Sequence, residues 1–420
     1  MALILAAAPL LSRRPLLTLL AAAFTLAGCG GGWRPPTVLF LAVGTNREQR
    51  VDTDLRADFQ ERLELLGRGF RQIHPATTIQ VGIYPGDQLI PAIRWRSRAG
   101  MEPDLMFING DSALRLLRQG LVRPFPASPE LLQEIDPALL DRVRNPNGQL
   151  AGLPILVQTQ LSCFNRRQVS QAPRDLNALL QLSADGQAVG MPLDPVNVLW
   201  TAGSLGAMPA LEKSLRGQAL SLADRQAIER WLSWLREASG QRRLSFFASQ
   251  EESREEFEAG RVAWIPCNSI ELPQLERRLG TNLGVAPLPD GPDGQPAAAV
   301  NRVRVIALGR HSSQQGSLRA LDFARYSVNP LTQRAMTTGS LTVLPANRFV
   351  SLPVQSSHRL RAMQTAAEQG RQTNALVALV NASDRRMPLL VQGVLTRLVF
   401  GDTSPAVARD ALVRILQPKR

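Results

Sequence analysis

The sequence predicts an α/β protein of two compact units, in which each unit is a doubly wound, mostly parallel sheet flanked by helices. The chain has 420 residues, of which 44% are hydrophobic and 20% are charged. It is therefore too long for a single core and too apolar to be disordered. Strand-like and helical patterns alternate along it with short connections, which is the order that a parallel sheet requires.

The N-terminus resembles an export signal. An apolar run, residues 15–28, follows two arginines and is shorter than the roughly 20 residues of a membrane-spanning helix. It ends in Leu26-Ala27-Gly28-Cys29, which resembles the lipobox of bacterial lipoproteins. That resemblance implies that residues 1–28 are a signal peptide, that Cys29 is lipidated, and that residues 29–36 form a flexible tether to the membrane. The preceding Ser-Arg-Arg also resembles the start of a twin-arginine signal, so the export route, Sec or twin-arginine, stays open.

The charge balance favours anionic partners but not nucleic acid. Lys and Arg together number 48 against 35 Asp and Glu, a net charge of +13, and only Lys213 and Lys419 are lysines. The arginines are scattered, only 5% of residues are aromatic, and no nucleic-acid-binding motif has its required spacing. Three cysteines and three histidines lie too far apart in sequence to suggest a metal cage, so we expect no metal and no cofactor.

Two readings of the inner cysteines, Cys163 and Cys267, stay open. In an oxidising compartment they form a disulfide, or each is a small buried apolar residue.

The first half alternates buried strands with helices. Residues 37–43 are apolar and β-branched without polar alternation, as expected for a strand covered on both faces. Apolar residues recur every three or four positions through 55–73, the spacing of an amphipathic helix. The alternation continues with strands at 78–84 and 103–110 and with helices at 87–99 and 111–120. In such a sheet the loops after the strands form the ligand-facing edge.

The second half repeats this pattern. Residues 151–165 form a long extended segment that is expected to run from one unit into the next. Further helices are predicted at 195–207, 222–238 and 250–260, and further strands at 261–266, 282–289 and 302–308. From residue 318 onward the chain is predicted to be mostly helical.

Polar residues at strand ends are the candidate ligands. The loops of the first unit supply Thr45, Asn46, Asp87, Asn109 and Asp111. For both aspartates, capping of a helix N-terminus is the competing explanation. Polar side chains inside the apolar extended segment need a ligand, a partner or water to satisfy them; these are Gln158, Thr159 and Gln160.

The whole chain after residue 28 resembles the extracellular solute-binding proteins of bacterial ABC importers, in their maltose- and multiple-sugar-binding branch. Five segments carry this resemblance in the family's order: FRQIHPATTIQV (70–81), PDLMFING with RQGLVRPF (103–125), GLPILVQTQLSCFN (152–165), EFEAGRVAWIPCNS with LGVAPLPDGPDGQP (256–296) and NPLTQRAMTTGSLTVLPAN (329–347).

The resemblance implies a two-lobe periplasmic-binding-protein fold joined by hinge strands. Lobe 1 would comprise 37–158 plus 269–327, and lobe 2 would comprise 159–268 plus 330–420. A cleft between the lobes would close over a sugar, a glycosyl-polyol or a related polyol, and the protein would deliver it to the transmembrane subunits of an ABC permease. We expect a lipid-anchored monomer on the periplasmic side of the envelope, with no catalytic residues.

The resemblance adds further candidate ligands. Asn268 and Ser269 follow the second predicted crossover, and Ser340 lies in a loop that reaches the cleft in the family. Trp200 and Trp264 are candidates to stack under a sugar ring, with core packing as the alternative.

The chain departs from the family pattern where aromatic rings are common. It has Gly44-Thr45, Cys163-Phe164-Asn165 and Asn268-Ser269-Ile270 at those places. This loss disfavours a plain oligosaccharide. Arginines near the late strands leave a phosphorylated or anionic solute open, with surface solvation as the alternative; they are Arg302, Arg304 and Arg348.

Two other classes of function compete with solute capture. An envelope enzyme acting on glycosides would need catalytic carboxylates, but pairs such as Glu251-Glu252 lie on a highly charged helix, where solvation is the expected role. No nucleophile elbow, zinc motif, phosphate loop or Cys-x-x-Cys is present. The other class is an envelope scaffold or sensor partner that kept the fold without its pocket.

Overall fold

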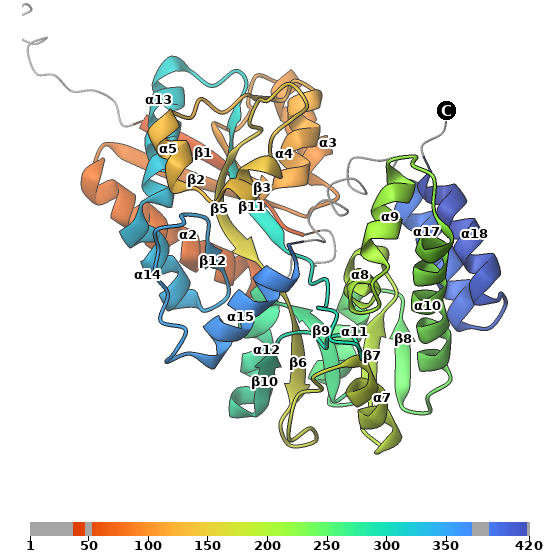
Figure 1. The fold of residues 1–420 in the computed structure, drawn as a ribbon. Coiled ribbons are helices and arrows are strands. Elements are labelled where there is room, and N and C mark those ends of the chain that lie inside the picture. The colour runs from red at the N-terminus through yellow and green to blue at the C-terminus, as the bar shows by residue number, and fades with distance from the viewer. Residues whose placement is uncertain (1–36, 47–52, 372–385, 418–420) are drawn as a thin grey trace, which may run out of the picture.

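The chain folds into two lobes, each built around one sheet (Figure 1). A computed structural model describes residues 37–46, 53–371 and 386–417. The predicted signal peptide, the predicted lipidation site Cys29 and the predicted tether lie outside the described residues.

The first lobe holds a seven-stranded sheet in the order β12-β5-β11-β3-β1-β2, with β4 paired to β11. Its strands are β1 (Thr37–Gly44), β2 (Thr77–Tyr84), β3 (Leu105–Asn109), β4 (Val122–Arg123), β5 (Leu153–Gln158), β11 (Arg302–Gly309) and β12 (Leu344–Pro345). The pairs β1–β2 and β1–β3 are parallel, whereas β11 runs antiparallel to β3 and β5. The sheet is therefore mixed.

The second lobe holds a five-stranded sheet in the order β10-β6-β9-β7-β8. Its strands are β6 (Gln160–Asn165), β7 (Val189–Pro192), β8 (Leu244–Phe247), β9 (Trp264–Asn268) and β10 (Leu283–Ala286). Here β7 is parallel to β8 and β9, while β6 is antiparallel to β9 and β10. The predicted two-lobe α/β architecture is confirmed, but the prediction that each sheet is mostly parallel is wrong, because antiparallel pairs of β5, β6, β9, β10, β11 and β12 run through both sheets.

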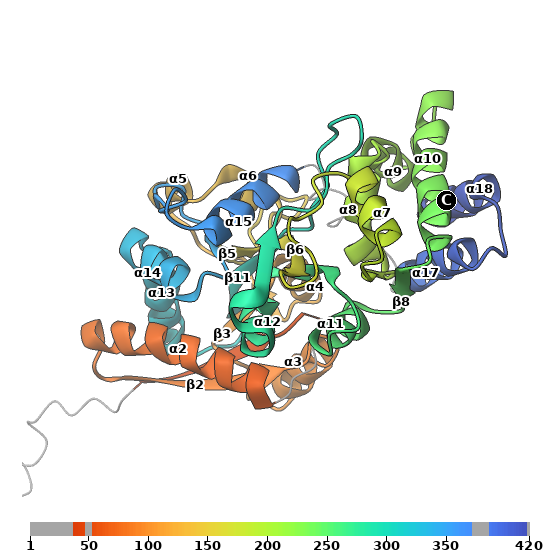
Figure 2. The ribbon, with the colours of Figure 1, turned by 90° about the horizontal axis from the view of Figure 1, so that it is seen from below.

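Helices cover both sheets. Those of the first lobe are α2 (Thr53–Ile73), α3 (Leu89–Arg98), α4 (Gly110–Arg118), α5 (Pro129–Glu134), α6 (Pro137–Asp141), α13 (Gln314–Val328) and α14 (Pro330–Ser340). Those packed with the second sheet are α7 (Leu176–Ala184), α8 (Pro195–Ser204), α9 (Met208–Leu215), α10 (Leu222–Ser239), α11 (Gln250–Glu258), α12 (Leu272–Leu279), α15 (His358–Gln369), α17 (Arg386–Val399) and α18 (Pro405–Leu416). In the view from below, α10, α17 and α18 form a layer at the end farthest from α2 (Figure 2).

The predicted extended segment at 151–165 is two strands rather than one. The single residue Thr159 separates β5 of the first sheet from β6 of the second, so the chain passes directly from one lobe into the other there. Every residue of β5 is buried, as its continuous apolar run predicts. The short parallel strands β7 and β8 were not predicted from the sequence.

Strand pairing places two segments differently from the predicted lobe boundaries. The β10 segment, assigned to lobe 1 from the sequence, pairs with β6 in the second sheet. The β12 segment, assigned to lobe 2, pairs with β5 in the first sheet. The chain therefore crosses between the lobes at Thr159, again through 287–301, and a third time between β12 and α15.

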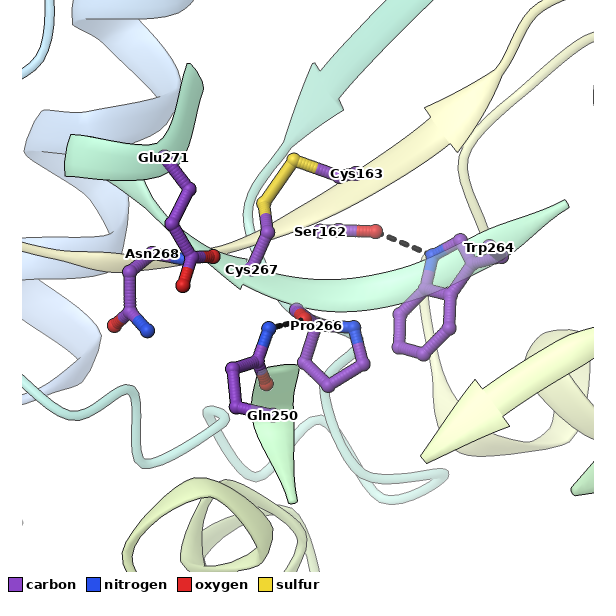
Figure 3. Close-up of a disulfide and its surroundings, with 8 residues drawn as sticks. All are labelled: Ser162, Cys163, Gln250, Trp264, Pro266, Cys267, Asn268 and Glu271. Carbon is purple, nitrogen blue, oxygen red and sulfur yellow. Dashed lines mark hydrogen bonds between the residues drawn. A yellow bond between two sulfur atoms is a disulfide. The ribbon is translucent and has the colours of Figure 1, made fainter. Parts of the chain in front are cut away.

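The structure contains a disulfide between Cys163 and Cys267, beside the first crossing (Figure 3). Cys163 lies on β6 and Cys267 on the neighbouring strand β9, with their Cα atoms 5.8 Å apart. Both are fully buried. Of the two readings left open by the sequence, the structure therefore has the disulfide.

Helix α10 begins with a reciprocal cap. The Ser221 hydroxyl accepts a hydrogen bond from the Asp224 N–H, and the Asp224 carboxylate accepts one from the Ser221 N–H. The ammonium of Lys213, on α9, lies 2.9 Å from the same carboxylate. Hydrogen bonds from Lys213 and from Ser221 lower the pKa of Asp224 to about 2.

We expect the stabilising effect of Asp224 to depend on pH. Because its pKa is lower in the folded protein, its contribution is complete above the unfolded value and is lost as pH falls toward 2. Asp224→Asn should therefore be less stable than the wild type at pH 7, with a difference that shrinks between pH 4 and pH 2. Urea unfolding across this pH range measures it, and a difference independent of pH would contradict the assignment.

Candidate functional site

The polar ends of the two sheets meet at the junction between the lobes. The parallel strands β1 and β3 and the strand β5 end there on the first lobe, and β7 and β9 end there on the second. In α/β sheets, ligands bind outside the carboxyl ends of the strands. Both sheets therefore present this edge to the same crossing point, Thr159.

Three amide side chains form a hydrogen-bonded row on the first lobe. Asn109 Nδ2 donates to Asn46 Oδ1 at 3.0 Å, and Asn46 Nδ2 donates to Gln158 Oε1 at 3.3 Å. Asn46 and Gln158 are buried, and Asn109 is half-buried. The residues come from the ends of β1, β3 and β5, which is where the sequence analysis placed these three candidate ligands.

Arg304 donates hydrogen bonds to this row and to the backbone beside it. Its guanidinium donates to Asn109 Oδ1 at 2.9 Å and to the carbonyls of Gly44 and Phe107 at 2.6 and 3.0 Å. Burial lowers its pKa to about 9, opposed by the charge of Asp111. Through its hydrogen bonds to Gly44 and Phe107, Arg304 links the ends of β1 and β3.

The burial of Arg304 was not predicted. The sequence carried a signal, since two arginines alternate with valines at the start of the apolar strand at 302–308. Residues two apart on a strand share a face, so both guanidinium groups lie on one side of β11. That side faces the junction, because Arg302 Nη1 donates to Asn268 Oδ1.

The second lobe adds a buried carboxyl group. Glu271 Oε2 accepts a hydrogen bond from the Asn268 N–H at 2.9 Å (Figure 3). Burial raises the pKa of Glu271, while that hydrogen bond and the charges of Arg254 and Arg302 oppose the rise. The sequence reasoning selected Asn268 but missed Glu271.

The crossing itself is held by fully buried polar groups. Ser269 Oγ accepts from the Thr159 N–H at 3.1 Å and donates to the Thr342 carbonyl at 2.6 Å. Gln160 Nε2 donates to the Asn197 carbonyl at 2.9 Å. Thr159, Gln160 and Ser269 thus lie at the junction as predicted, and the Ser269–Thr342 hydrogen bond connects the two lobes.

Some buried polar atoms at the junction have no hydrogen-bond partner. They are Thr159 Oγ1, Asn197 Oδ1 and Asn301 Oδ1. Buried polar atoms are normally paired with protein or water. These three are therefore places where the hydroxyl of a solute, or a water molecule, would be stabilised.

The two tryptophans predicted to stack on a sugar are core residues instead. Trp200 on α8 and Trp264 on β9 are each 0% exposed, and their ring centroids lie 6.2 Å apart. The Trp264 indole N–H donates to the Ser162 hydroxyl (Figure 3). Neither ring offers a face to a ligand, so the stacking prediction is wrong and the core alternative holds.

Neither Asp87 nor Asp111 is a helix N-cap, which was the competing explanation from the sequence. Asp87 is exposed, and the N-cap of α3 is Gln88. Asp111 is the second residue of α4, whose N-cap is Asn109, and it pairs with Arg115 at 3.7 Å. Capping therefore explains neither aspartate, and Asp111 lies near the junction because it follows Asn109 by two residues at the start of α4.

Two hydroxyl residues make local contacts. Thr45 is buried and donates to the Asn46 carbonyl at 3.3 Å. The Ser340 hydroxyl donates back to the Met336 carbonyl within α14, at 2.8 Å. It is Thr342, two residues further on, that contacts Ser269 across the junction.

Comparison with protein families decides the class of protein. The family model described as bacterial extracellular solute-binding protein matches residues 68–363, which is more than half of the chain. The chain belongs to this family. Solute-binding proteins are transport components that hold a solute without changing its bonds, so this protein is not an enzyme.

The solved structures support the fold. The GacH receptor of Streptomyces glaucescens has 15% sequence identity and a TM-score of 0.67, over 90% of this chain and 97% of that chain. The maltose–maltodextrin binding protein of Alicyclobacillus acidocaldarius has 16% identity and a TM-score of 0.64, over 91% and 100%. A solute-binding protein of Thermotoga lettingae, bound to α-D-tagatose, has 15% identity and a TM-score of 0.63, over 90% and 100%. A search of curated proteins finds no match.

The family description places this solute-binding protein on the extracellular or periplasmic side of the membrane. Among the helices of the described residues, none combines the length and apolar character needed to cross a membrane.

Proposed function

We propose that this solute-binding protein captures a carbohydrate-like solute between its two lobes and delivers it to the permease of an ABC importer. One observation carries the proposal: the carboxyl edges of both sheets meet at one junction lined by Asn46, Asn109, Gln158 and Asn268. Amide side chains both donate and accept, which suits the hydroxyl groups of a sugar or polyol.

The crossing geometry supports capture by closure. Two lobes joined by a few crossing segments can rotate about them while each lobe keeps its own core. The direct crossing at Thr159 is one residue long. The structural neighbours bind acarbose, maltodextrins and tagatose, and these agree with a hydroxyl-rich ligand.

The lipid anchor belongs to the same proposal. Thioether attachment of lipid at Cys29 would hold the protein at the membrane beside its permease, and the tether at 29–36 would let it reach the permease. Mass spectrometry of the protein purified from membranes tests this, and a mature N-terminus other than Cys29 would contradict it.

Thermal-shift screening with sugars and polyols tests the capture function. The series includes maltose, maltotriose, glucose, tagatose, glycerol and inositol. A ligand present at one hundred times its Kd should stabilise the folded protein by about 2.7 kcal/mol. If neither these compounds nor their anionic derivatives shift the melting temperature, the scaffold or sensor alternative replaces capture.

Asn109→Ala should weaken binding of the best ligand of that screen by about tenfold or more, because a half-buried hydrogen-bonding group is lost. Asn282→Ala is the matched control. Asn282 is also half-buried, but it precedes β10 at the far end of the second sheet. Isothermal titration calorimetry measures both, and equal losses in the two variants would contradict the assignment of the site.

A further inference from the structure

The charges around Asp111 are unbalanced. Arg115 forms an ion pair with Asp111. The charge of the same carboxylate also raises the pKa of Arg142 and of Arg304, against the lowering by burial. In the part of the chain that the structure describes, no second carboxylate raises the pKa of either of those two arginines. Asp111 is therefore paired with Arg115 and also balances part of the charge of Arg142 and Arg304.

Arg142 and Arg304 are otherwise held by neutral oxygens. Arg142 follows α6, and its Nη2 donates to the Asn301 carbonyl at 2.6 Å. Arg304 donates only to carbonyl and amide oxygens. Arg142 Nη1 and Arg304 Nε are buried and have no hydrogen-bond partner.

A buried guanidinium nitrogen without a hydrogen-bond partner is costly. For Arg142, burial lowers the pKa to about 10. The planar guanidinium group can donate two parallel hydrogen bonds to the two oxygens of a carboxylate or a phosphate. The two arginines also lie at the site already described, since Arg142 binds the carbonyl next to β11 and Arg304 binds Asn109.

We propose that the solute carries an anionic group, a carboxylate or a phosphate, which binds Arg142 directly and is stabilised by the charge of Arg304. This inference rests on the proposed capture function and names the class of its solute. Arg142 and Asp111 are half-buried whereas Arg304 is 1% exposed, so Arg142 is the more accessible of the two arginines. Asp111 then limits the affinity for the anion by repulsion.

Inorganic phosphate is the first probe. Calorimetric titration of the whole protein should show saturable binding that Arg142→Gln weakens by about 10- to 100-fold, because a charge-assisted hydrogen bond is lost. Arg123→Gln is the matched control and should bind phosphate as the wild type does. Arg123 is half-buried with an unpartnered Nε, but on β4 it lies beside Leu308, at the other end of β11.

Removing a negative charge at the site, rather than a positive one, distinguishes a loss of anion binding from a loss of folding. Asp111→Asn should bind phosphate more tightly than the wild type, since it removes the repulsive charge. Destabilisation alone would weaken binding in every variant. Weaker phosphate binding in Asp111→Asn, or equal losses in Arg142→Gln and Arg123→Gln, would overturn the proposal.

Matched sugars complete the test. Glucose 6-phosphate and glucuronate should each be compared with glucose, and glycerol 3-phosphate with glycerol, by thermal shift. We expect at least one anionic compound to bind ten times more tightly than its neutral counterpart, and the compound that does so tells phosphate from carboxylate. Preference for the neutral member of every pair would overturn this inference and leave the capture function standing, while no shift with any compound would overturn both.

Discussion

Replacing Cys163 and Cys267 together by alanine should lower the free energy of unfolding by about 3–5 kcal/mol. The bond links residues 104 apart in sequence, so its loss frees a long loop in the unfolded chain. Both sulfurs are fully buried between β6 and β9, and Cys267 precedes Asn268 of the site. Urea unfolding followed by tryptophan fluorescence measures the change.

Reduction of the unfolded wild-type protein provides the control for the disulfide. Refolding and unfolding in the presence of a reductant should bring the wild type down to the stability of the double variant, and the reductant should leave the double variant unchanged. A thiol assay of the denatured, unreduced protein should find neither inner cysteine reactive. If both react there, the bond is absent and the prediction fails.

Trp264→Ala should cost about 3–5 kcal/mol of stability, because it opens a large cavity in the core of the second lobe. Trp264 is 0% exposed, packs beside Trp200, and donates its indole N–H to Ser162. A loss of this size is typical when a large buried side chain is replaced by alanine. Urea unfolding of the purified variant measures it.

Trp264→Phe distinguishes the core role from a stacking role. Phenylalanine keeps most of the apolar volume but loses the indole hydrogen bond, so we expect a smaller loss of stability and an unchanged Kd for the solute. If the Trp264 ring stacked on a sugar, the variant would keep its stability and its affinity for the solute would fall. Near-wild-type stability with affinity lowered tenfold would restore Trp264 as a ligand-binding residue.

The sequence predicted the parts of the fold that have a strong period or a continuous apolar run. The strand at 37–43 and the helix at 55–73 correspond to β1 and α2, and the strand-end position of Asn46 and Asn109 followed from that order. That Gln158 needs a polar partner also followed from its place in a buried strand, although the sequence did not identify Asn46 as that partner. These inferences need only local pattern and the geometry of parallel sheets.

Other features depend on which elements pack together, and a single sequence does not encode that locally. The strands β7 and β8 are four residues each and too short to show a period. Trp200 and Trp264 are buried because α8 and β9 bring their rings together in the core of the second lobe, although their spacing is equally compatible with a cleft. Arg304 is buried although isolated arginines are usually solvated, because three oxygens from β1 and β3 accept its N–H groups.

The same dependence explains the lobe boundaries. A strand such as β10 has the pattern of any short half-buried strand, and only its pairing with β6 assigns it to the second sheet. The pairing of β12 with β5 likewise returns the chain to the first sheet before α15.

A crystal structure with the tightest-binding compound of the screens tests the central claim most directly. The account predicts one solute molecule between the two sheets, contacting Asn109 on the first lobe and Asn268 or Asn197 on the second, with its anionic group at Arg142. A solute bound elsewhere, for example among the outer helices α10, α17 and α18, would contradict it.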